Sequence, residues 1–153
     1  MVTWNGQQYF IIFIDDFFIY DYVYLVSEKL QLLNVFKSYK AEVENQLNKR
    51  LKSIRSNRYG EYYGRYDDLR ELCLGLFAKF LYEYDFVPHY TMSGSPNMNY
   101  VVERQNHSFK DMVRSMFNHS TLLQSHWGKA FKTASYILNR SQIKATIKTH
   151  YEL

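Results

Sequence analysis

The order of the elements expected along this chain predicts an α/β fold. Apolar and β-branched runs of strand length alternate with segments whose apolar residues recur every three or four positions. A long helical segment stands between two of these runs, which favours a parallel crossover. A chain of 153 residues, 46% of them hydrophobic, is large enough to bury a core. We therefore predict one domain that covers residues 1–153.

The first half of the chain is expected to form a hairpin, a helix and a third strand. Residues 9–14 and 20–26 are apolar and β-branched runs, and together they predict an antiparallel hairpin. Ser27 is suited to cap a helix that continues to about Leu47, because the apolar residues of this segment follow the helical period. Residues 51–56 are expected to form a short strand.

The second half of the chain is expected to be mostly helical. Residues 66–84 have a broad apolar face and predict a helix, and residues 86–91 predict a short strand. Pro88 favours an edge position for that strand, because proline donates no hydrogen bond to a neighbour. Two further helices are predicted over residues 99–118 and 121–139.

The composition limits the class of protein. Cys73 is the only cysteine, which excludes an internal disulfide and a cysteine-based zinc site, and we expect it to pack on the helix of residues 66–84. The five histidines lack the spacing of metal ligands. No apolar run has the length of a membrane span, and the first residues do not resemble a signal peptide. We expect an intracellular protein that is not secreted and has no membrane partner.

Positive charge is concentrated towards the C-terminus. Residues 104–150 contain eight Lys or Arg and one acidic residue, for a net charge of +7, whereas residues 1–103 sum to −2. This distribution is what a phosphate-binding face needs, and it is also compatible with an ordinary solvated helix surface. Composition alone leaves both interpretations open.

Four short motifs resemble the catalytic core of copia-type retrotransposon integrases. They are Ile-Arg-Ser-Asn-Arg-Tyr-Gly-Glu-Tyr at 54–62, Val-Val-Glu-Arg-Gln-Asn at 101–106, Asp-Met-Val-Arg-Ser-Met at 111–116 and Tyr-Ile-Leu-Asn-Arg at 136–140. The resemblance extends from Tyr9 to Leu153. It implies a ribonuclease H-like mixed sheet flanked by helices, and an inherited role in cutting and joining DNA ends in the nucleus.

The resemblance also implies a two-metal Asp-Asp-Glu site that uses Mg²⁺ or Mn²⁺. The family's first aspartate lies on a strand upstream of Tyr9, so we expect this first, central strand to be missing. The family's second aspartate corresponds to Asn57, a neutral amide, and its glutamate corresponds to Glu103. Two-metal chemistry needs several carboxylates around the ions, so we predict that Glu103 is a remnant ligand and that this copy is inactive. Asp15 and Asp16 belong to another family motif and not to the triad.

The predicted helix of residues 99–118 carries Glu103, His107, Lys110 and Arg114 at helical spacing, on one polar face. We predict that nucleic acid is bound by the basic residues Arg104, Lys110, Arg114, Lys129, Lys132 and Arg140. The alternatives are a non-catalytic nucleic-acid-binding module, a self-associating module that forms a homo-oligomer, and a gene fragment that folds poorly. Tyr59, Tyr62, Tyr63 and Tyr66 are compatible with base stacking or with ordinary packing.

Overall fold

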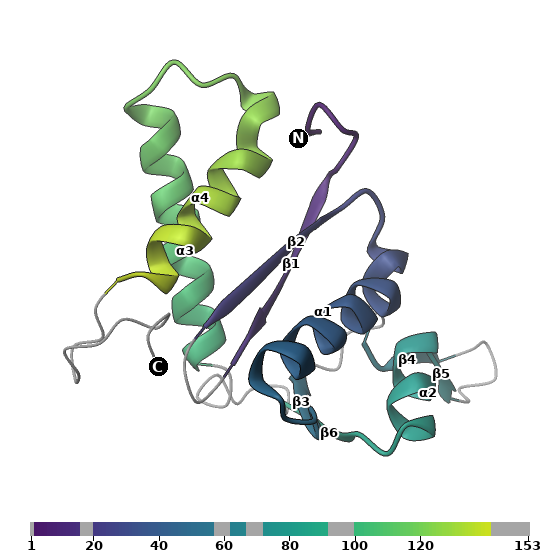
Figure 1. The fold of residues 1–153 in the computed structure, drawn as a ribbon. Coiled ribbons are helices and arrows are strands. Elements are labelled where there is room, and N and C mark those ends of the chain that lie inside the picture. The colour runs from purple at the N-terminus through teal and green to yellow at the C-terminus, as the bar shows by residue number, and fades with distance from the viewer. Residues whose placement is uncertain (1, 16–19, 57–61, 67–71, 92–99, 142–153) are drawn as a thin grey trace. The chain divides into compact units, whose positions relative to one another are not determined.

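The computed structural model describes residues 2–15, 20–56, 62–66, 72–91 and 100–141 (Figure 1). These residues group into two compact units. Unit 1 comprises the described residues of 1–28 and 100–153, and unit 2 comprises those of 29–99. The prediction of a single domain over 1–153 stays a prediction.

Unit 1 consists of a hairpin and two long helices. Strands β1 (Tyr9–Ile14) and β2 (Asp21–Val26) pair antiparallel, with Tyr9 opposite Val26 and Ile14 opposite Asp21. The helices are α3 (Tyr100–Asn118) and α4 (Trp127–Asn139), and a short 3₁₀ turn, η3 (Gln124–His126), precedes α4. α4 packs against β2 and α3 packs against α4. The predicted hairpin and the helix predicted over 99–118 are confirmed.

One face of the hairpin packs on the two helices. The buried core of unit 1 contains Phe109 and Val113 from α3 and Trp127, Ala130, Phe131 and Ala134 from α4. Phe10 and Leu25 of the hairpin pack against this core, and the ring of Phe10 lies 4.3 Å from that of Phe131. At Gly128 a Cβ atom would come within 2.7 Å of Leu25 Cδ1. The missing side chain therefore allows the backbone of α4 to approach β2 closely.

Unit 2 contains two helices and two small sheets. Strands β3 (Ser53–Ser56) and β6 (Val87–Tyr90) pair in parallel, and β4 (Gly64–Tyr66) pairs antiparallel with β5 (Leu72–Leu74). The helices are α1 (Leu32–Leu47), which follows the 3₁₀ turn η1 (Lys29–Gln31), and α2 (Leu76–Glu83). In the described part of the chain β6 pairs on one side only, which agrees with the edge position predicted from Pro88.

The core of unit 2 is built around Phe36 of α1, which is completely buried. Its ring meets the rings of Phe77, Phe80 and Phe86 edge-on, at centroid distances of 5.1, 6.2 and 5.6 Å. Edge-to-face contacts at these distances are favourable because the positive ring edge meets the negative ring face. This cluster joins α1 to α2 and to the residue before β6.

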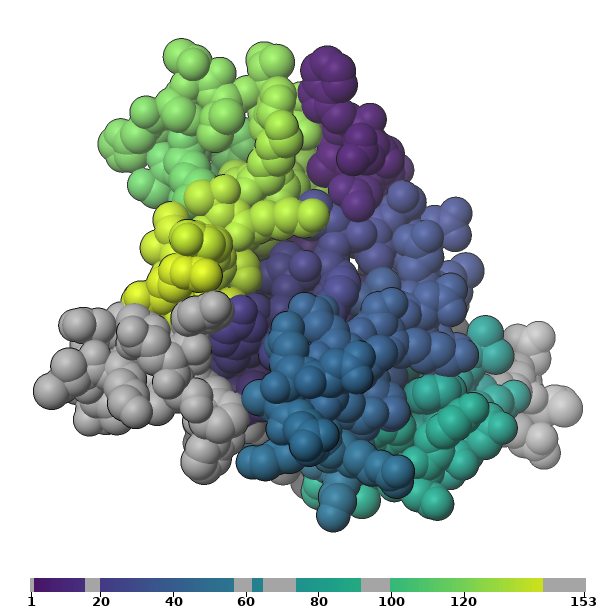
Figure 2. Space-filling model, in the orientation of Figure 1, coloured from purple at the N-terminus to yellow at the C-terminus, as the bar shows by residue number. Residues whose placement is uncertain are grey.

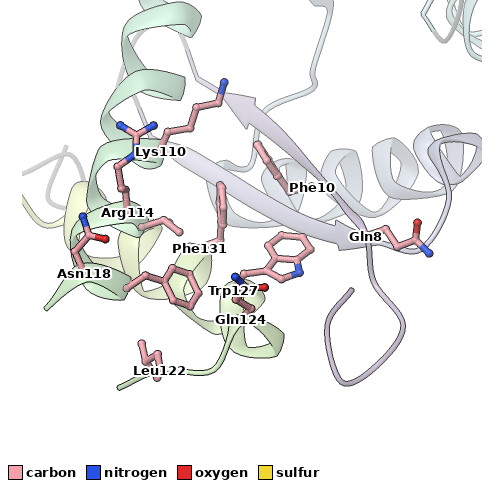
Figure 3. Close-up of a pocket in the computed structure, with 11 residues that line it drawn as sticks. Gln8, Phe10, Lys110, Arg114, Asn118, Leu122, Gln124, Trp127 and Phe131 are labelled. Atoms are coloured by element: carbon pink, nitrogen blue, oxygen red, sulfur yellow. The ribbon is translucent and has the colours of Figure 1, made fainter. Parts of the chain in front are cut away.

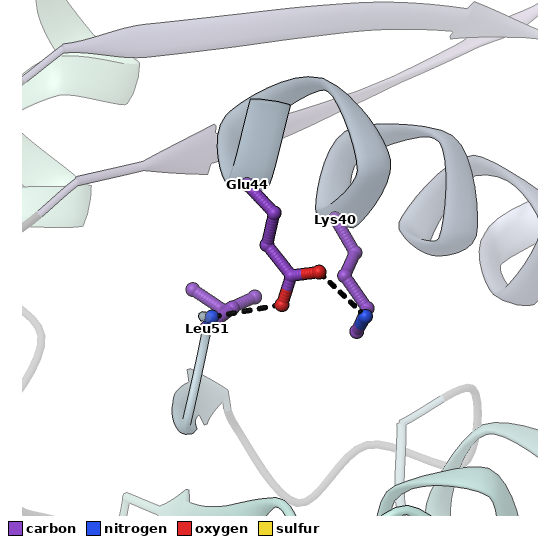
Figure 4. A network of polar contacts seen from close by, with 3 residues as sticks. All are labelled: Lys40, Glu44 and Leu51. Atoms are coloured by element: carbon purple, nitrogen blue, oxygen red, sulfur yellow. Dashed lines mark hydrogen bonds and ion pairs between the residues drawn. The ribbon is translucent and has the colours of Figure 1, made fainter. Parts of the chain in front are cut away.

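The end of α1 is tied to the chain that follows it by Glu44 (Figure 4). One carboxylate oxygen pairs with Lys40 Nζ at 2.8 Å, and the other accepts the Leu51 N–H at 3.0 Å. The hydrogen bond from Lys40 is the main cause that lowers the pKa of Glu44 below its usual value. Asn48 follows the helix with a φ of 50°, the left-handed conformation common after a helix end.

Three predictions from local sequence were wrong in detail. α1 begins at Leu32 and not after Ser27, because the 3₁₀ turn η1 comes between them. The region 66–84 is not one helix, since Leu72–Leu74 pairs with Gly64–Tyr66 and α2 begins only after Gly75. Cys73 therefore lies on a strand. The helix predicted over 121–139 begins at Trp127, after η3. Apolar spacing fits a short strand as well as a helix, and tertiary pairing decides between them.

The α/β class is confirmed, and the parallel pair within unit 2 is β3–β6, connected through α2. The parallel crossover predicted through the first long helix would join strands of different units, so it stays a prediction. In the described residues the strands form three separate two-stranded sheets. The expected missing central strand stays a prediction. In the same residues, no helix has the length and apolar character needed to cross a membrane.

Candidate nucleic-acid interface

Glu103 lies in the first turn of α3, and its side chain is exposed. His107, Lys110 and Arg114 are also exposed and follow on the same side of the helix. The polar face predicted from their spacing is therefore confirmed. The start of a helix favours a carboxylate, because the free backbone N–H groups there are partly positive.

The described residues do not fit a two-metal site. Among them, no group of three or more His, Cys, Asp or Glu side chains is placed to hold a metal ion. Asn57 and Asp16 lie outside the described residues. The roles of Glu103 as a remnant ligand and of Asn57 as a substituted ligand accordingly stay predictions.

Three of the predicted DNA-binding cations lie on α3, and all are exposed. Arg114 Nη1 lies 3.1 Å from Asp111 Oδ1, and both side chains are largely in solvent, so this ion pair holds Arg114 only weakly. Lys110 makes no ion pair with another described residue. Arg104 lies one position after Glu103, so it projects about a quarter-turn away from the polar face.

The other three predicted cations form a stripe along α4. Lys129, Lys132, Tyr136 and Arg140 follow at steps of three, four and four residues, which places them on one side of the helix. All four side chains are exposed. The Arg140 guanidinium lies 3.7 Å from the centre of the Tyr136 ring, a cation–π contact that fixes both groups. We call these four residues the α4 stripe.

The N-terminal end of the α4 stripe borders a hollow of about 460 Å³. Lys129 and Lys132 line it from α4, and Trp4, Asn5 and Gln7 line it from the segment before β1. In the space-filling view, this N-terminal segment (purple) lies against the light-green surface of the helices of unit 1 (Figure 2).

Trp4 is held in place although most of its surface is in solvent. The side chain is 78% exposed, and its Nε1–H donates to Ser125 Oγ at 2.8 Å. An exposed indole next to two lysines has the chemistry of a base-stacking platform. Trp4 was missed in the sequence, because a tryptophan five residues before a hairpin gives no local sign that it will line the same hollow as Lys129.

Asp21, at the start of β2, is the buried acid of unit 1, with 2% of its surface exposed. Its Oδ2 lies 3.4 Å from Gln105 Nε2, and its buried Oδ1 has no hydrogen-bond partner. Burial raises the pKa of this carboxyl to about 7, because the charged form loses its hydration. Asp21 could not be selected from the sequence, because its burial depends on contacts with α3 and α4.

Two of the candidate base-stacking tyrosines, Tyr62 and Tyr63, have both backbone and side chain described by the structure. The ring of Tyr62 meets Phe77 edge-on at 5.9 Å, and that of Tyr63 meets Tyr90 at 4.8 Å. Both are partly buried, which supports the packing interpretation for these two residues. Tyr59 lies outside the described residues.

The sequence relatives of this chain are retrotransposon polyproteins, and the chain matches a part of each. The chain is 36% identical over 137 residues to the retrovirus-related Pol polyprotein from transposon TNT 1-94 of Nicotiana tabacum, covering 90% of this chain and 10% of that protein. It is 27% identical over 136 residues to the corresponding polyprotein from transposon RE2 of Arabidopsis thaliana, covering 89% of this chain and 8% of the relative. The chain thus spans about a tenth of the length of these relatives. No family model matches the sequence.

Solved structures show the same fold in retroviral proteins. The HTLV-2 integrase catalytic core domain, in complex with magnesium, superposes with a TM-score of 0.56 at 16% identity, covering 92% of this chain and 80% of that one. The catalytic core domain of BIV integrase gives a TM-score of 0.61 at 12% identity, covering 99% and 87%. The chain is therefore related in sequence to a segment of retrotransposon Pol polyproteins, and its fold is the ribonuclease H-like fold of integrase catalytic cores.

Proposed function

We propose that this chain is an integrase core-like protein that binds DNA through unit 1 and does not catalyse strand transfer. The observation that carries the proposal is the α4 stripe beside the exposed indole of Trp4. Lys129 and Lys132 form no ion pair with described residues, so their charges are available to phosphates. Cations along a rigid helix can follow a phosphate backbone, and an immobilised indole adds a surface for a base.

The loss of metal-dependent catalysis is proposed from the residues at the motif positions. Asn57 stands where the family has its second metal-binding aspartate, and an amide cannot offset the charge of a divalent ion as a carboxylate does. Glu103 is the triad position that keeps its carboxylate, and one carboxylate is too few for two ions. The resemblance to integrases suggests that this DNA binding derives from a role in DNA integration in the nucleus.

The binding proposal is tested by the salt dependence of DNA affinity. We would measure the anisotropy of a labelled single-stranded oligonucleotide at several salt concentrations, for the intact chain and for the double variant Lys129→Gln/Lys132→Gln. Each phosphate contact contributes roughly −0.7 to the slope of log affinity against log salt for single strands. The double variant should therefore bind more weakly, with a slope shallower by about 1.4.

A matched double variant separates a local contact from a change in net charge. Lys52→Gln/Lys79→Gln removes two exposed charges from unit 2 and changes the net charge by the same amount. We expect this control to keep the slope of the intact chain. An equal loss in both double variants, or no affinity at low salt in the intact chain, would refute binding at the α4 stripe.

The absence of catalysis is tested separately, by metal binding without DNA and by strand transfer. A thermal melt with and without millimolar Mn²⁺ should give the same midpoint, because a site without its carboxylates has little affinity for the ion. A strand-transfer assay with Mn²⁺ should show no joined product. An upward shift of the melt together with joined product would overturn the proposed inactivity and leave the binding proposal intact.

A further inference from the structure

Trp4 and Asn5 form the tip of a closed turn in the segment before β1. The Gly6 N–H donates to the Thr3 carbonyl at 3.0 Å, so Trp4 and Asn5 are the two central residues of a β-turn. The Thr3 N–H donates to the Gln7 carbonyl at 2.8 Å, and Thr3 Oγ1 accepts the Gln7 N–H at 2.9 Å. These bonds join the two ends of the turn, and both residues at its tip are exposed.

The turn is also anchored to the rest of unit 1. Gln7 Nε2 donates to the Leu25 carbonyl of β2 at 3.2 Å. Trp4 Nε1 donates to Ser125 Oγ at 2.8 Å, and the Trp4 ring lies 6.2 Å from the ring of His126. An aromatic ring that is already held in place loses little conformational freedom when it binds a ligand. The turn therefore presents a pre-formed aromatic surface.

The hollow of about 460 Å³ joins this turn to two positive charges. Lys129 and Lys132 of α4 are exposed and line the hollow together with Trp4 and Asn5. Its volume is in the range of small-ligand pockets, roughly 300–1,000 Å³. The hollow thus offers an indole to the face of a base, an amide to the edge of a base, and two ammonium groups to phosphates. Together these groups match the parts of a single nucleotide.

We propose that the hollow binds one unpaired nucleotide of a DNA strand in preference to base-paired DNA. The inference rests on the proposed DNA binding by unit 1 and names the form of DNA that is bound. The base stacks on Trp4, and the Asn5 amide pairs with its edge. Lys129 and Lys132 hold the adjoining phosphates. In a duplex the faces of a base are stacked and its pairing edge is occupied, so a base reaches the indole only when it is unpaired.

The test uses the full chain and two labelled strands of about ten nucleotides that carry the same number of phosphates. One strand is oligothymidine, and the other has an abasic tetrahydrofuran unit in place of every nucleoside. Fluorescence anisotropy of the label measures the two affinities. Oligothymidine should bind at least about fivefold more tightly, because stacking of one base on an aromatic side chain contributes at least this factor.

The intrinsic fluorescence of tryptophan reports where the base lies. Trp4 is 78% exposed, whereas the second tryptophan, Trp127, is 6% exposed and meets Phe131 edge-on at 5.6 Å (Figure 3). A base that stacks on an indole quenches its emission, so oligothymidine should quench part of the emission and the abasic strand should not. Trp4→Leu should abolish this quenching, because only the buried Trp127 then emits, and should lower oligothymidine affinity at least about fivefold.

Three further variants separate the parts of the site. Ser125 is a positioning residue that orients the indole, so Ser125→Ala should weaken binding of oligothymidine and leave binding of the abasic strand unchanged. Asn5→Ala should have the same pattern, because the edge of the base loses its partner. Tyr82→Leu, at an exposed ring of α2 in unit 2, is the matched control for Trp4→Leu and should change neither affinity nor quenching.

Relaxed closed-circular duplex DNA, which has no ends, tests the preference for an unpaired base. Per phosphate, it should compete with labelled oligothymidine at least about fivefold less well than unlabelled oligothymidine does.

Three results would overturn the inference and leave the proposed binding by the α4 stripe in place. They are equal affinity for the two strands, equal competition by the circular duplex, and quenching that persists in Trp4→Leu. A loss of affinity for both strands in Ser125→Ala would refute the positioning role of Ser125. No binding of either strand at low salt would refute the proposed function together with this inference.

Discussion

Units 1 and 2 differ in what their buried and exposed side chains do. The core of unit 2 is built around Phe36 and the neighbouring aromatic rings. Its polar network, at Glu44, connects α1 to the segment that follows it. Unit 1 has a core around Phe109, and it also holds a buried acid and the exposed α4 stripe. Features that are costly or unnecessary for stability are concentrated in unit 1, and such features commonly mark binding surfaces.

The largest effect is expected from breaking the core of unit 2. Phe36→Ala removes a fully buried ring that contacts three others, so the free energy of unfolding should fall by about 3–5 kcal/mol. Chemical denaturation would measure the total. Hydrogen exchange would show where protection is lost, and we expect the loss in α1 and α2 with smaller changes in α4. An equal loss in both units would show that the chain unfolds as one cooperative domain.

Asp21 should make unit 1 sensitive to pH. The folded chain holds a proton on this carboxyl up to about pH 7, whereas the unfolded chain releases it near the ordinary value of 3.8. The folded state binds more protons in this interval, so stability is greatest below about pH 4 and falls as the pH rises to about 7. The contribution of this group amounts to roughly 4 kcal/mol.

The variant Asp21→Asn removes the titrating group and keeps the hydrogen bonds between the Asp21 backbone and the Asn139 side chain. Above about pH 7 it should be more stable than the intact chain by up to roughly 4 kcal/mol, and below about pH 4 the difference should vanish. Urea denaturation at several pH values would measure the difference. Asp111→Asn, at an exposed acid, should change stability by less than about 0.5 kcal/mol at any pH. A pH-independent difference for Asp21→Asn would contradict the assigned pKa.

The smallest effect is expected at Glu44. Glu44→Ala removes the ion pair with Lys40 and the acceptor of the Leu51 N–H, and should cost about 1 kcal/mol near neutral pH. Because the pKa of Glu44 is lowered in the folded chain, this stabilisation should be lost as the pH falls below the ordinary value for glutamate. Thermal melts would compare it with Glu83→Ala, an exposed position on α2, for which we expect a smaller change.

The regular elements with strong periodicity were predictable because their signals are local. The strands Tyr9–Ile14 and Asp21–Val26 and the helix Tyr100–Asn118 have a consistent pattern over their whole length. The region 66–84 was mispredicted because the strand Leu72–Leu74 is defined by its partner Gly64–Tyr66, and no local pattern encodes a partner.

The residues of the candidate site likewise include some that were predictable from the sequence and some that were not. The cations Lys129, Lys132 and Arg140 were chosen as candidates because positive charge is concentrated towards the C-terminus of the sequence. Trp4 was missed, because only the folded chain brings residue 4 to Ser125 and to these lysines. The burial of Asp21 was missed for the same reason.

The sequence by itself predicted the resemblance to integrase cores, the α/β class and the helix faces of α3 and α4. These properties depend on residue identity and on spacing within one segment. Only the tertiary structure decided which acid is buried and which aromatic residue lies beside the basic stripe. Each of these depends on contacts between segments far apart in the chain, and burial and hydrogen bonding exist only once those contacts form.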